Sequence, residues 1–292
     1  MGLIAPKRRL ASGLVLTCAA FGFGAPPELE AKATQAVAGG AHSCALKANG
    51  RARCWGYDFF DQASPPRGQF KSLDAGGVHN CGIRPNGRAR CWGDRFYGQA
   101  SPPGGKFAAV AAGNHHSCGL RRNGKVRCWG DDDHGQTSAP SGRFISLSTS
   151  LDHTCGVRGN GRVRCWGRND TDQGSALGGR WRSVGAGSFH SCGLRPGGRA
   201  RCWGLDADER ISAPGARFRS LGVGGSHACG VTMNRRAGCW GWNEDGQSSP
   251  PGGRFASLSA GSTHSCGLRP NGTVRCWGLD DRGQSTVPPR LR

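Results

Sequence analysis

The apolar positions of this chain fall into short runs separated by glycine-rich turns, and they show no helical periodicity. In one representative stretch, residues 70–73 (Phe-Lys-Ser-Leu) form a predicted strand, and residues 79–84 and 88–93 form two more. Between the last two lies Pro-Asn-Gly at residues 85–87, which fits a type I turn followed by a left-handed glycine. The pattern therefore predicts short antiparallel strands joined by tight turns.

The same stretch recurs every 37 residues, seven times, with no insertion or deletion from residue 33 onward. Each unit has one cysteine two residues after a histidine and a second cysteine directly before a tryptophan. The first cysteines are Cys44, Cys81, Cys118, Cys155, Cys192, Cys229 and Cys266, and the second are Cys54, Cys91, Cys128, Cys165, Cys202, Cys239 and Cys276. Three or four strands in so short a unit indicate a β-propeller or a β-solenoid.

The regularity of the units favours a closed ring. A solenoid needs atypical repeats at its ends, whereas the last unit here is as regular as the others. The chain stops where the next phenylalanine strand would begin, and a matching segment at residues 34–37 (Thr-Gln-Ala-Val) opens the repeats. We therefore predict an all-β, seven-bladed β-propeller over residues 33–292, in which the segment at 34–37 completes the last blade.

The turn at residues 85–87 also sets the pairing of the two strands that it joins, and it places Cys81 opposite Cys91. Counted from the turn, this is a non-hydrogen-bonded pair, where the Cα atoms are close enough for a disulfide. We expect one such disulfide in each blade, which uses 14 of the 15 cysteines and leaves Cys18. Zinc binding by the His-x-Cys pairs is the competing interpretation, but seven identical zinc sites in an exported protein would be unusual. We expect no metal and no cofactor.

The N-terminus accounts for the cysteine content. A basic stretch at residues 7–9 precedes an apolar stretch at 10–23, as in a secretory signal that is too short to span a membrane. We predict a signal peptide at residues 1–25, a short linker at 26–32 and a protein that is secreted, periplasmic or attached to the cell envelope. A lipid on Cys18 is an alternative, although residues 15–17 (Val-Leu-Thr) match poorly. No other segment has the length and apolar character of a membrane span.

The common pattern of the units is Ala-Gly-x-x-His-Ser-Cys-Gly-Leu-Arg-x-Asn-Gly-x-Val-Arg-Cys-Trp-Gly, then Gly-Gln. This resembles the repeat of the regulator of chromosome condensation superfamily, and the compact units most resemble its bacterial branch, which includes the propeller-type β-lactamase inhibitor protein. The resemblance covers about 260 residues and implies the propeller fold. It does not imply one function, because the superfamily includes a nucleotide exchange factor, chromatin binders and enzyme inhibitors. Blade four departs from the pattern at Ser150, and blade six at Arg235 and Gly238.

Charge should separate between the two faces of the ring. We call top the face of the Gly-x-x-His turns and of the loops after Trp-Gly. The loops after Trp-Gly alone contain 15 of the 19 acidic residues. The bottom face has the Asn-Gly turns and the connections between units. Its basic residues are Arg84, Arg88, Arg121, Lys125, Arg158, Arg162, Arg195, Arg199 and Arg269, with Lys106, Arg143, Arg180, Arg217 and Arg254 in the connections. Net charge is +20.

Beyond the predicted signal peptide, the aromatic residues outside the repeat pattern all fall in top loops. They are Tyr57, Phe59, Phe60, Phe96, Tyr97, Phe189 and Trp242, and five of the seven belong to blades one and two. Exposed aromatic residues surrounded by acids are typical of a binding hot spot. We predict that a protein partner binds Tyr57, Phe59, Phe60, Phe96, Tyr97 and Trp242, with Asp58, Asp61 and Asp94 attracting a basic partner. The alternative is that these aromatic residues only pack among themselves.

Other functions have weaker support in the sequence. The basic bottom face could bind a polyanion, such as an anionic glycan, a lipid headgroup or a nucleic acid. A propeller hydrolase or lyase is a second alternative, but nearly every histidine and cysteine belongs to the repeat and no catalytic residues stand out. The acidic loops could hold Ca²⁺, and the seven repeated histidines are better explained as hydrogen-bonding spacers than as metal ligands. We expect a monomer that is not an enzyme.

Overall fold

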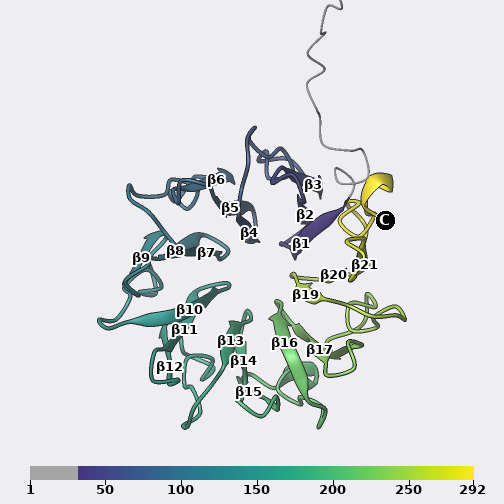
Figure 1. Ribbon diagram of the computed structural model, residues 1–292. Coiled ribbons are helices and arrows are strands. Elements are labelled where there is room, and N and C mark those ends of the chain that lie inside the picture. The colour runs from purple at the N-terminus through teal and green to yellow at the C-terminus, as the bar shows by residue number, and fades with distance from the viewer. Residues whose placement is uncertain (1–31) are drawn as a thin grey trace, which may run out of the picture.

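The computed structural model describes residues 32–292, which form seven three-stranded antiparallel sheets. The sheets surround a central axis as the blades of a propeller (Figure 1). Strands of one blade follow each other in the chain and in the sheet, so each blade is a simple meander. The predicted all-β, seven-bladed fold is confirmed.

The strands take the same three positions in every blade. The inner strands are β1 (Ala33–Ala38), β4 (Ser72–Ala75), β7 (Ala109–Ala112), β10 (Phe144–Thr149), β13 (Ser183–Ala186), β16 (Phe218–Val223) and β19 (Ser257–Ala260). The middle strands are β2 (His42–Lys47), β5 (His79–Ile83), β8 (His116–Leu120), β11 (His153–Arg158), β14 (His190–Leu194), β17 (His227–Thr232) and β20 (His264–Leu268). The outer strands are β3 (Ala52–Gly56), β6 (Ala89–Gly93), β9 (Val126–Gly130), β12 (Val163–Gly167), β15 (Ala200–Gly204), β18 (Ala237–Gly241) and β21 (Val274–Gly278). Two short 3₁₀ helices, η1 (Ala207–Glu209) and η2 (Pro289–Leu291), lie in the last loop of blade five and at the C-terminus.

The predicted disulfides are present in all seven blades, between the middle and outer strands. Cys81 is opposite Cys91 and Ile83 is opposite Ala89, as the turn at residues 85–87 requires. The Cα atoms of the bonded cysteines are 4.0–4.1 Å apart, the close spacing of a non-hydrogen-bonded pair. The bonds are Cys44–Cys54, Cys81–Cys91, Cys118–Cys128, Cys155–Cys165, Cys192–Cys202, Cys229–Cys239 and Cys266–Cys276.

The expectation that residues 34–37 complete the last blade is wrong. They belong to β1, which pairs with β2 as the inner strand of blade one, and blade seven is built entirely from β19–β21. At its start, the N-terminal segment is joined to blade seven by a backbone bond from Ala33 N to Gly272 O at 2.8 Å. The same bond joins Phe70 N to Gly50 O between blades one and two. Residue 33 therefore enters blade one as Phe70 enters blade two, and the ring closes without a shared sheet.

The apolar core lies between neighbouring blades. One cluster joins Val37, Leu46 and the Cys44–Cys54 disulfide of blade one to Phe70, Leu73 and Trp92 of blade two. The corresponding cluster between blades seven and one joins Leu268 and Val274 to Ala36 and Trp55. Val287 and Leu291 of the C-terminal segment pack into this cluster and so strengthen the closure.

The predicted signal peptide at residues 1–25, the linker up to residue 31 and Cys18 lie outside the described residues. Within residues 32–292, no helix has both the length and the apolar character needed to cross a membrane.

Candidate functional site

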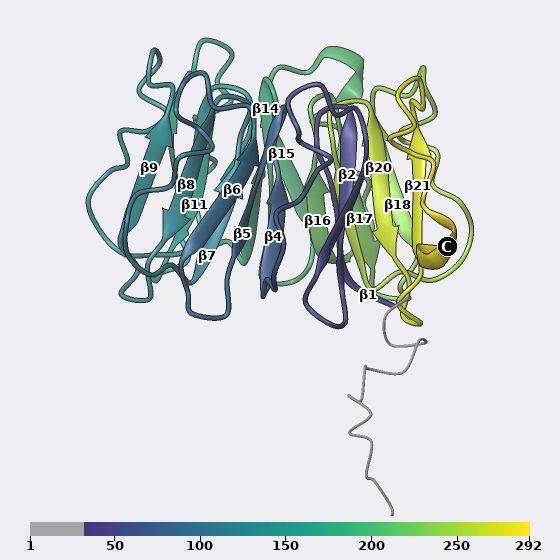
Figure 2. The same ribbon diagram turned by 90° about the horizontal axis from the view of Figure 1, so that it is seen from above.

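The top face is formed by the turns between inner and middle strands together with the loops that follow the outer strands. The backbone N–H of Tyr57 donates to Ala41 O at 2.9 Å, and that of Asp94 donates to Val78 O at 3.0 Å. These bonds hold the start of each loop against the turn of its own blade. The loops therefore project from one edge of the ring, the upper edge in Figure 2.

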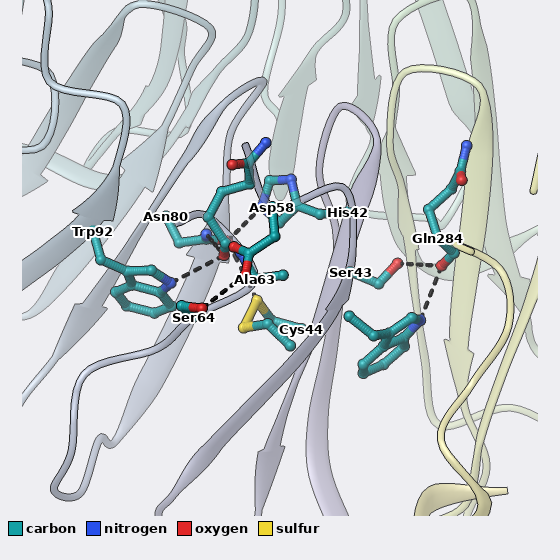
Figure 3. Close-up of a disulfide and its surroundings, with 12 residues drawn as sticks. His42, Ser43, Cys44, Asp58, Ala63, Ser64, Asn80, Trp92 and Gln284 are labelled. Atoms are coloured by element: carbon teal, nitrogen blue, oxygen red, sulfur yellow. Dashed lines mark hydrogen bonds between the residues drawn. A yellow bond between two sulfur atoms is a disulfide. The ribbon is translucent and has the colours of Figure 1, made fainter. Parts of the chain in front are cut away.

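Gln62 anchors the loop of blade one through its side chain and its backbone carbonyl. Its Oε1 accepts a hydrogen bond from Phe60 N at 2.8 Å. Its backbone carbonyl accepts two more from blade two, from Trp92 Nε1 at 3.1 Å and Asn80 Nδ2 at 2.8 Å. Figure 3 shows the bonds from Trp92 and Asn80 beside the disulfide of Cys44. In blade two Gln99 has the same role toward Tyr97 N and Trp129. The loops that carry the candidate aromatic residues are thus anchored to rigid strands.

Phe59 and Phe96 are the most exposed of these aromatic residues. Their exposed fractions are 75% and 83%, against 38% for Phe60 and 45% for Tyr97. Exposed aromatic side chains of this kind are candidates for contact with a partner. Tyr57 is half-buried and lies under the guanidinium of Arg282 from blade seven, at 5.4 Å.

The aromatic residues form two groups, one on each blade. In blade one, the ring centroids of Tyr57 and Phe59 are 6.3 Å apart, and Phe60 contacts Phe59 edge-on at 4.9 Å. In blade two, Tyr97 lies 5.0 Å from Phe96 and 4.9 Å from the ring of His115. We call Tyr57, Phe59, Phe60, Phe96 and Tyr97 the top-face aromatic cluster. Trp242 and Phe189 lie in blades six and five and take no part in it.

Two of the three acidic residues predicted to attract a partner are held in the loops. The Asp58 carboxylate accepts from Ala63 N at 2.6 Å and from Ser64 Oγ at 2.7 Å. Asp94 accepts from Phe96 N at 3.0 Å and Gln99 Nε2 at 2.9 Å. Asp61 is exposed and has a positive φ of 61°. Asp58 and Asp94 therefore shape the loops, in addition to any effect of their charge on a partner.

The repeated histidines form hydrogen bonds, as expected of hydrogen-bonding spacers, but the sequence did not show that their partners lie in the next blade. In six junctions the Nε2 of one blade's histidine lies 2.7–2.9 Å from a Ser, Thr or Asn side chain of the next blade. In these six junctions, the same polar side chain also donates to the backbone carbonyl of the residue equivalent to Gln62. In all seven junctions, that carbonyl accepts a hydrogen bond from the Trp Nε1 of the next blade. The feature of the sequence that could have indicated these contacts is the recurrence of Gly-Gln and His-Ser every 37 residues.

The same histidines are placed where they cannot reach a substrate. A Ser–His pair at hydrogen-bonding distance is the arrangement of an activated nucleophile. Here all seven histidines are fully buried. Burial lowers the pKa of each from 6.5 to about 3 or 4, so they are neutral spacers at physiological pH. Within residues 32–292, no three His, Cys, Asp or Glu side chains are grouped as metal ligands would be.

A channel of about 400 Å³ runs along the axis between the inner strands and their turns. Asp74 is the carboxylic acid among its lining residues. Its Oδ2 accepts a hydrogen bond from Ala112 N at 2.8 Å. Burial raises the pKa of Asp74 to about 7, against the opposing effect of backbone hydrogen bonds from Ala112 and Ala75.

The bottom face offers fewer free cations than the sequence predicts. Five of its arginines lie over the buried aromatic ring of their own unit, as Arg84 does over Phe70 at 4.1 Å and Arg195 over Trp181 at 3.6 Å. The others of this set are Arg121, Arg158 and Arg269. Several also donate to loop carbonyls, as Arg195 does to Gly178 O at 2.7 Å. These arginines hold the connections between blades.

The family of the chain is decided by a match to the model described as the regulator of chromosome condensation (RCC1) repeat. The matched segments are residues 33–62, 70–99, 107–136, 144–173, 181–208 and 255–284, more than half of the chain. The chain belongs to this family. Blade six (218–254), where Ala228, Arg235 and Gly238 depart from the RCC1 repeat, is not matched. A comparison with curated proteins found no match.

Solved structures similar to this RCC1-repeat chain include two plant receptor ectodomains. The ectodomain of the receptor kinase CR4 from Physcomitrella patens is 27% identical, with a TM-score of 0.73 over 85% of this chain and 74% of that one. The CRINKLY WD40 ectodomain of ACR4 from Arabidopsis thaliana is 25% identical, with a TM-score of 0.71 over 85% and 98%. Prp20p from Saccharomyces cerevisiae shares the fold at 14% identity, with a TM-score of 0.71 over 90% and 85%. Seven disulfides and the similarity to ectodomains indicate an oxidising extracellular or envelope location.

Proposed function

We propose that this RCC1-repeat propeller is a binding module that engages a protein partner through the top-face aromatic cluster. The observation that carries the proposal is the exposure of Phe59 and Phe96 on neighbouring, anchored loops. Rigid aromatic side chains supply a large contact area at a low entropic cost, which is why they dominate binding hot spots. The acidic residues around them favour a partner with a basic face.

The comparisons support a protein ligand by analogy of fold only. Prp20p has binding properties toward Gsp1p and histones, and the same protein, yeast RCC1 (Prp20), has been solved bound to Kap60. Prp20 is only 14% identical to this chain, so its ligands do not identify the partner of this chain. A closer kinship with the bacterial branch, which includes the propeller-type β-lactamase inhibitor protein, is a proposal that rests on the repeat pattern alone.

We further propose that the chain works by binding and not by catalysis, and that it is exported. The burial of every Ser–His pair and the presence of one carboxyl group in the central channel support the first point. The disulfides and the N-terminal pattern of residues 1–25 support the second. Release by signal cleavage is our preferred route, and a lipid anchor on Cys18 is the alternative.

Site-specific photo-cross-linking would test the protein-binding proposal. A photoreactive residue at position 96 should capture a discrete partner in the extracellular fraction of the producing cells. The matched control is position 233, because Met233 is 53% exposed but lies at the turn between β17 and β18 on the bottom face. Capture at both positions alike, or at 233 alone, would contradict the proposal.

A further inference from the structure

The outer strands carry a belt of basic side chains around the rim of the propeller. Two positions, one just before each outer strand and one at its second residue, are basic in nearly every blade. Together they are Arg51, Arg53, Arg88, Arg90, Lys125, Arg127, Arg162, Arg164, Arg199, Arg201, Arg236 and Arg275. We call these twelve residues the rim belt. Four of them, Arg88, Lys125, Arg162 and Arg199, were assigned to the bottom face from the sequence, and the structure places each directly before an outer strand. Only Gly238 and Thr273 interrupt the rim belt.

The rim belt is exposed and uncompensated. All twelve residues are exposed, and none forms an ion pair with a carboxylate within residues 32–292. The two members in a blade are two residues apart, so their side chains leave the strand on the same side. In this they differ from Arg84 and its equivalents, which lie over aromatic rings. The rim belt is therefore free to bind an anion.

Protection of the strand edge does not explain the composition of the belt. Any charge on an edge strand discourages pairing with another sheet, and lysine or glutamate would serve. Here eleven of the twelve residues are arginine. The guanidinium group binds carboxylate and sulfate groups with two parallel hydrogen bonds, which lysine cannot do.

A surface hollow in blade three shows how the belt can seat part of a ligand. The hollow measures about 650 Å³ and is lined by Lys125 and Arg127 of the rim belt. Arg121, Thr137 and Ser138 complete its polar lining. Cations beside hydroxyl groups suit a ligand that has both acidic and hydroxyl groups, as an acidic sugar has.

We propose that the rim belt binds a linear anionic polysaccharide that wraps around the outside of the ring. A flat membrane can contact only one sector of a wall that surrounds the ring, whereas a flexible chain can follow it from blade to blade (Figure 1). Nucleic acid is disfavoured because, within residues 32–292, the tryptophan of each outer strand is buried or partly buried and the exposed large apolar residues lie outside these strands, so the belt has no exposed aromatic side chain to stack on bases. The disulfides place the protein where such glycans occur. This site is separate from the top-face aromatic cluster.

The test compares two variants that lose the same charge from different surfaces. The rim variant is R53Q/R90Q/R127Q/R164Q/R201Q, and the control is K106Q/R143Q/R180Q/R217Q/R254Q in the exposed connections of the bottom face. The probes are heparin fragments and polygalacturonate of graded length. We expect the rim variant to bind more than tenfold more weakly at 150 mM salt with a shallower salt dependence, and the control to change less than threefold. Affinity for the native protein should rise with fragment length, because longer fragments reach more blades.

Three results would overturn the proposal. Equal losses in the two variants would show that only net charge matters, and a larger loss in the control would move the site to the bottom face. A single-stranded oligonucleotide that binds more tightly than a glycan of equal charge would assign the belt to nucleic acid. Vesicles containing anionic lipid that bind better than the glycans would assign it to membranes. Thermal unfolding of both variants checks that the fold is retained.

Discussion

The Nε2 of His190 has no hydrogen-bonding side chain on the next blade, because the residue that stands in the partner position is Ala228. The other six junctions have Ser, Thr or Asn there, as Ser191 for His153 at 2.9 Å. Nearby, Arg210 replaces the glutamine that anchors the loop in the other blades. The junction between blades five and six is therefore the one in which the inter-blade hydrogen bonds are incomplete.

Restoring the missing hydroxyl should stabilise the protein. In A228S the new Oγ can bond His190 Nε2 and donate to Arg210 O, whose carbonyl already accepts Trp240 Nε1 at 3.1 Å. We expect a gain of about 1 kcal/mol in the free energy of unfolding, since a buried polar atom obtains its partner. Chemical denaturation measures it. The matched control, S191A, removes the partner of His153 and should cost about 1–3 kcal/mol. A neutral or destabilising A228S would show that another group already satisfies His190.

The turn of blade six has a non-glycine residue in a backbone conformation that favours glycine. Arg235 has a φ of +66°, where the other six turns have glycine, as Gly161 with φ +79°. A side chain in this left-handed region costs about 1–2 kcal/mol, partly offset by the greater freedom of glycine in the unfolded chain. R235G should therefore raise the melting temperature by about 2–3 °C. G161A, which introduces the same conflict in blade four, should lower it. Equal melting temperatures for R235G and the native protein would contradict this reading of the turn.

Acid should destabilise the propeller steeply. The pKa of each repeated histidine is lowered by burial to about 3 or 4, so below pH 6.5 the unfolded chain takes up protons that the folded chain does not. Each histidine then removes about 1.4 kcal/mol of stability per pH unit, and seven act together between about pH 6 and pH 4. Melting temperatures across this range, with the disulfides intact, should fall sharply. A flat profile would contradict the burial of the histidines.

Asp74 should make the protein less stable as pH rises, which is the opposite of the effect of the histidines and smaller than it. Its pKa is raised to about 7, so the folded chain keeps a proton that the unfolded chain loses above pH 4. The contribution of Asp74 to the free energy of unfolding therefore falls as pH rises from about 4 to 7, by about 1.4 kcal/mol per pH unit. The seven histidines act together and outweigh this single residue. D74N keeps an acceptor for Ala112 N and should gain stability relative to the native protein at pH 7 but not at pH 4. The difference in unfolding free energy at the two pH values measures this.

The blade was predictable from the sequence, but the contacts between blades were not. The turn at residues 85–87 fixes the pairing of Cys81 with Cys91, so the disulfides followed from local chemistry. A cyclic repeat can be divided at any point, so the pattern did not show that β1 joins β2. The bond of His42 to Asn80 crosses to another blade, and a single unit gives no sign of it. Asp58 was predicted as a charge for a partner, and its bonds within the loop could not be seen without the backbone.

The central claim is that the top-face aromatic cluster binds a protein, and the affinity of the partner captured at position 96 tests it most directly. Phe59 and Phe96 are the residues to change, because Tyr57 and Tyr97 also pack against Arg282 and His115. We predict that F59A/F96A loses about 2–4 kcal/mol, roughly 30- to 1000-fold in Kd, while its melting temperature and the affinity of the M233A control stay unchanged. Native affinity in F59A/F96A, or a lower melting temperature without loss of binding, would contradict the account.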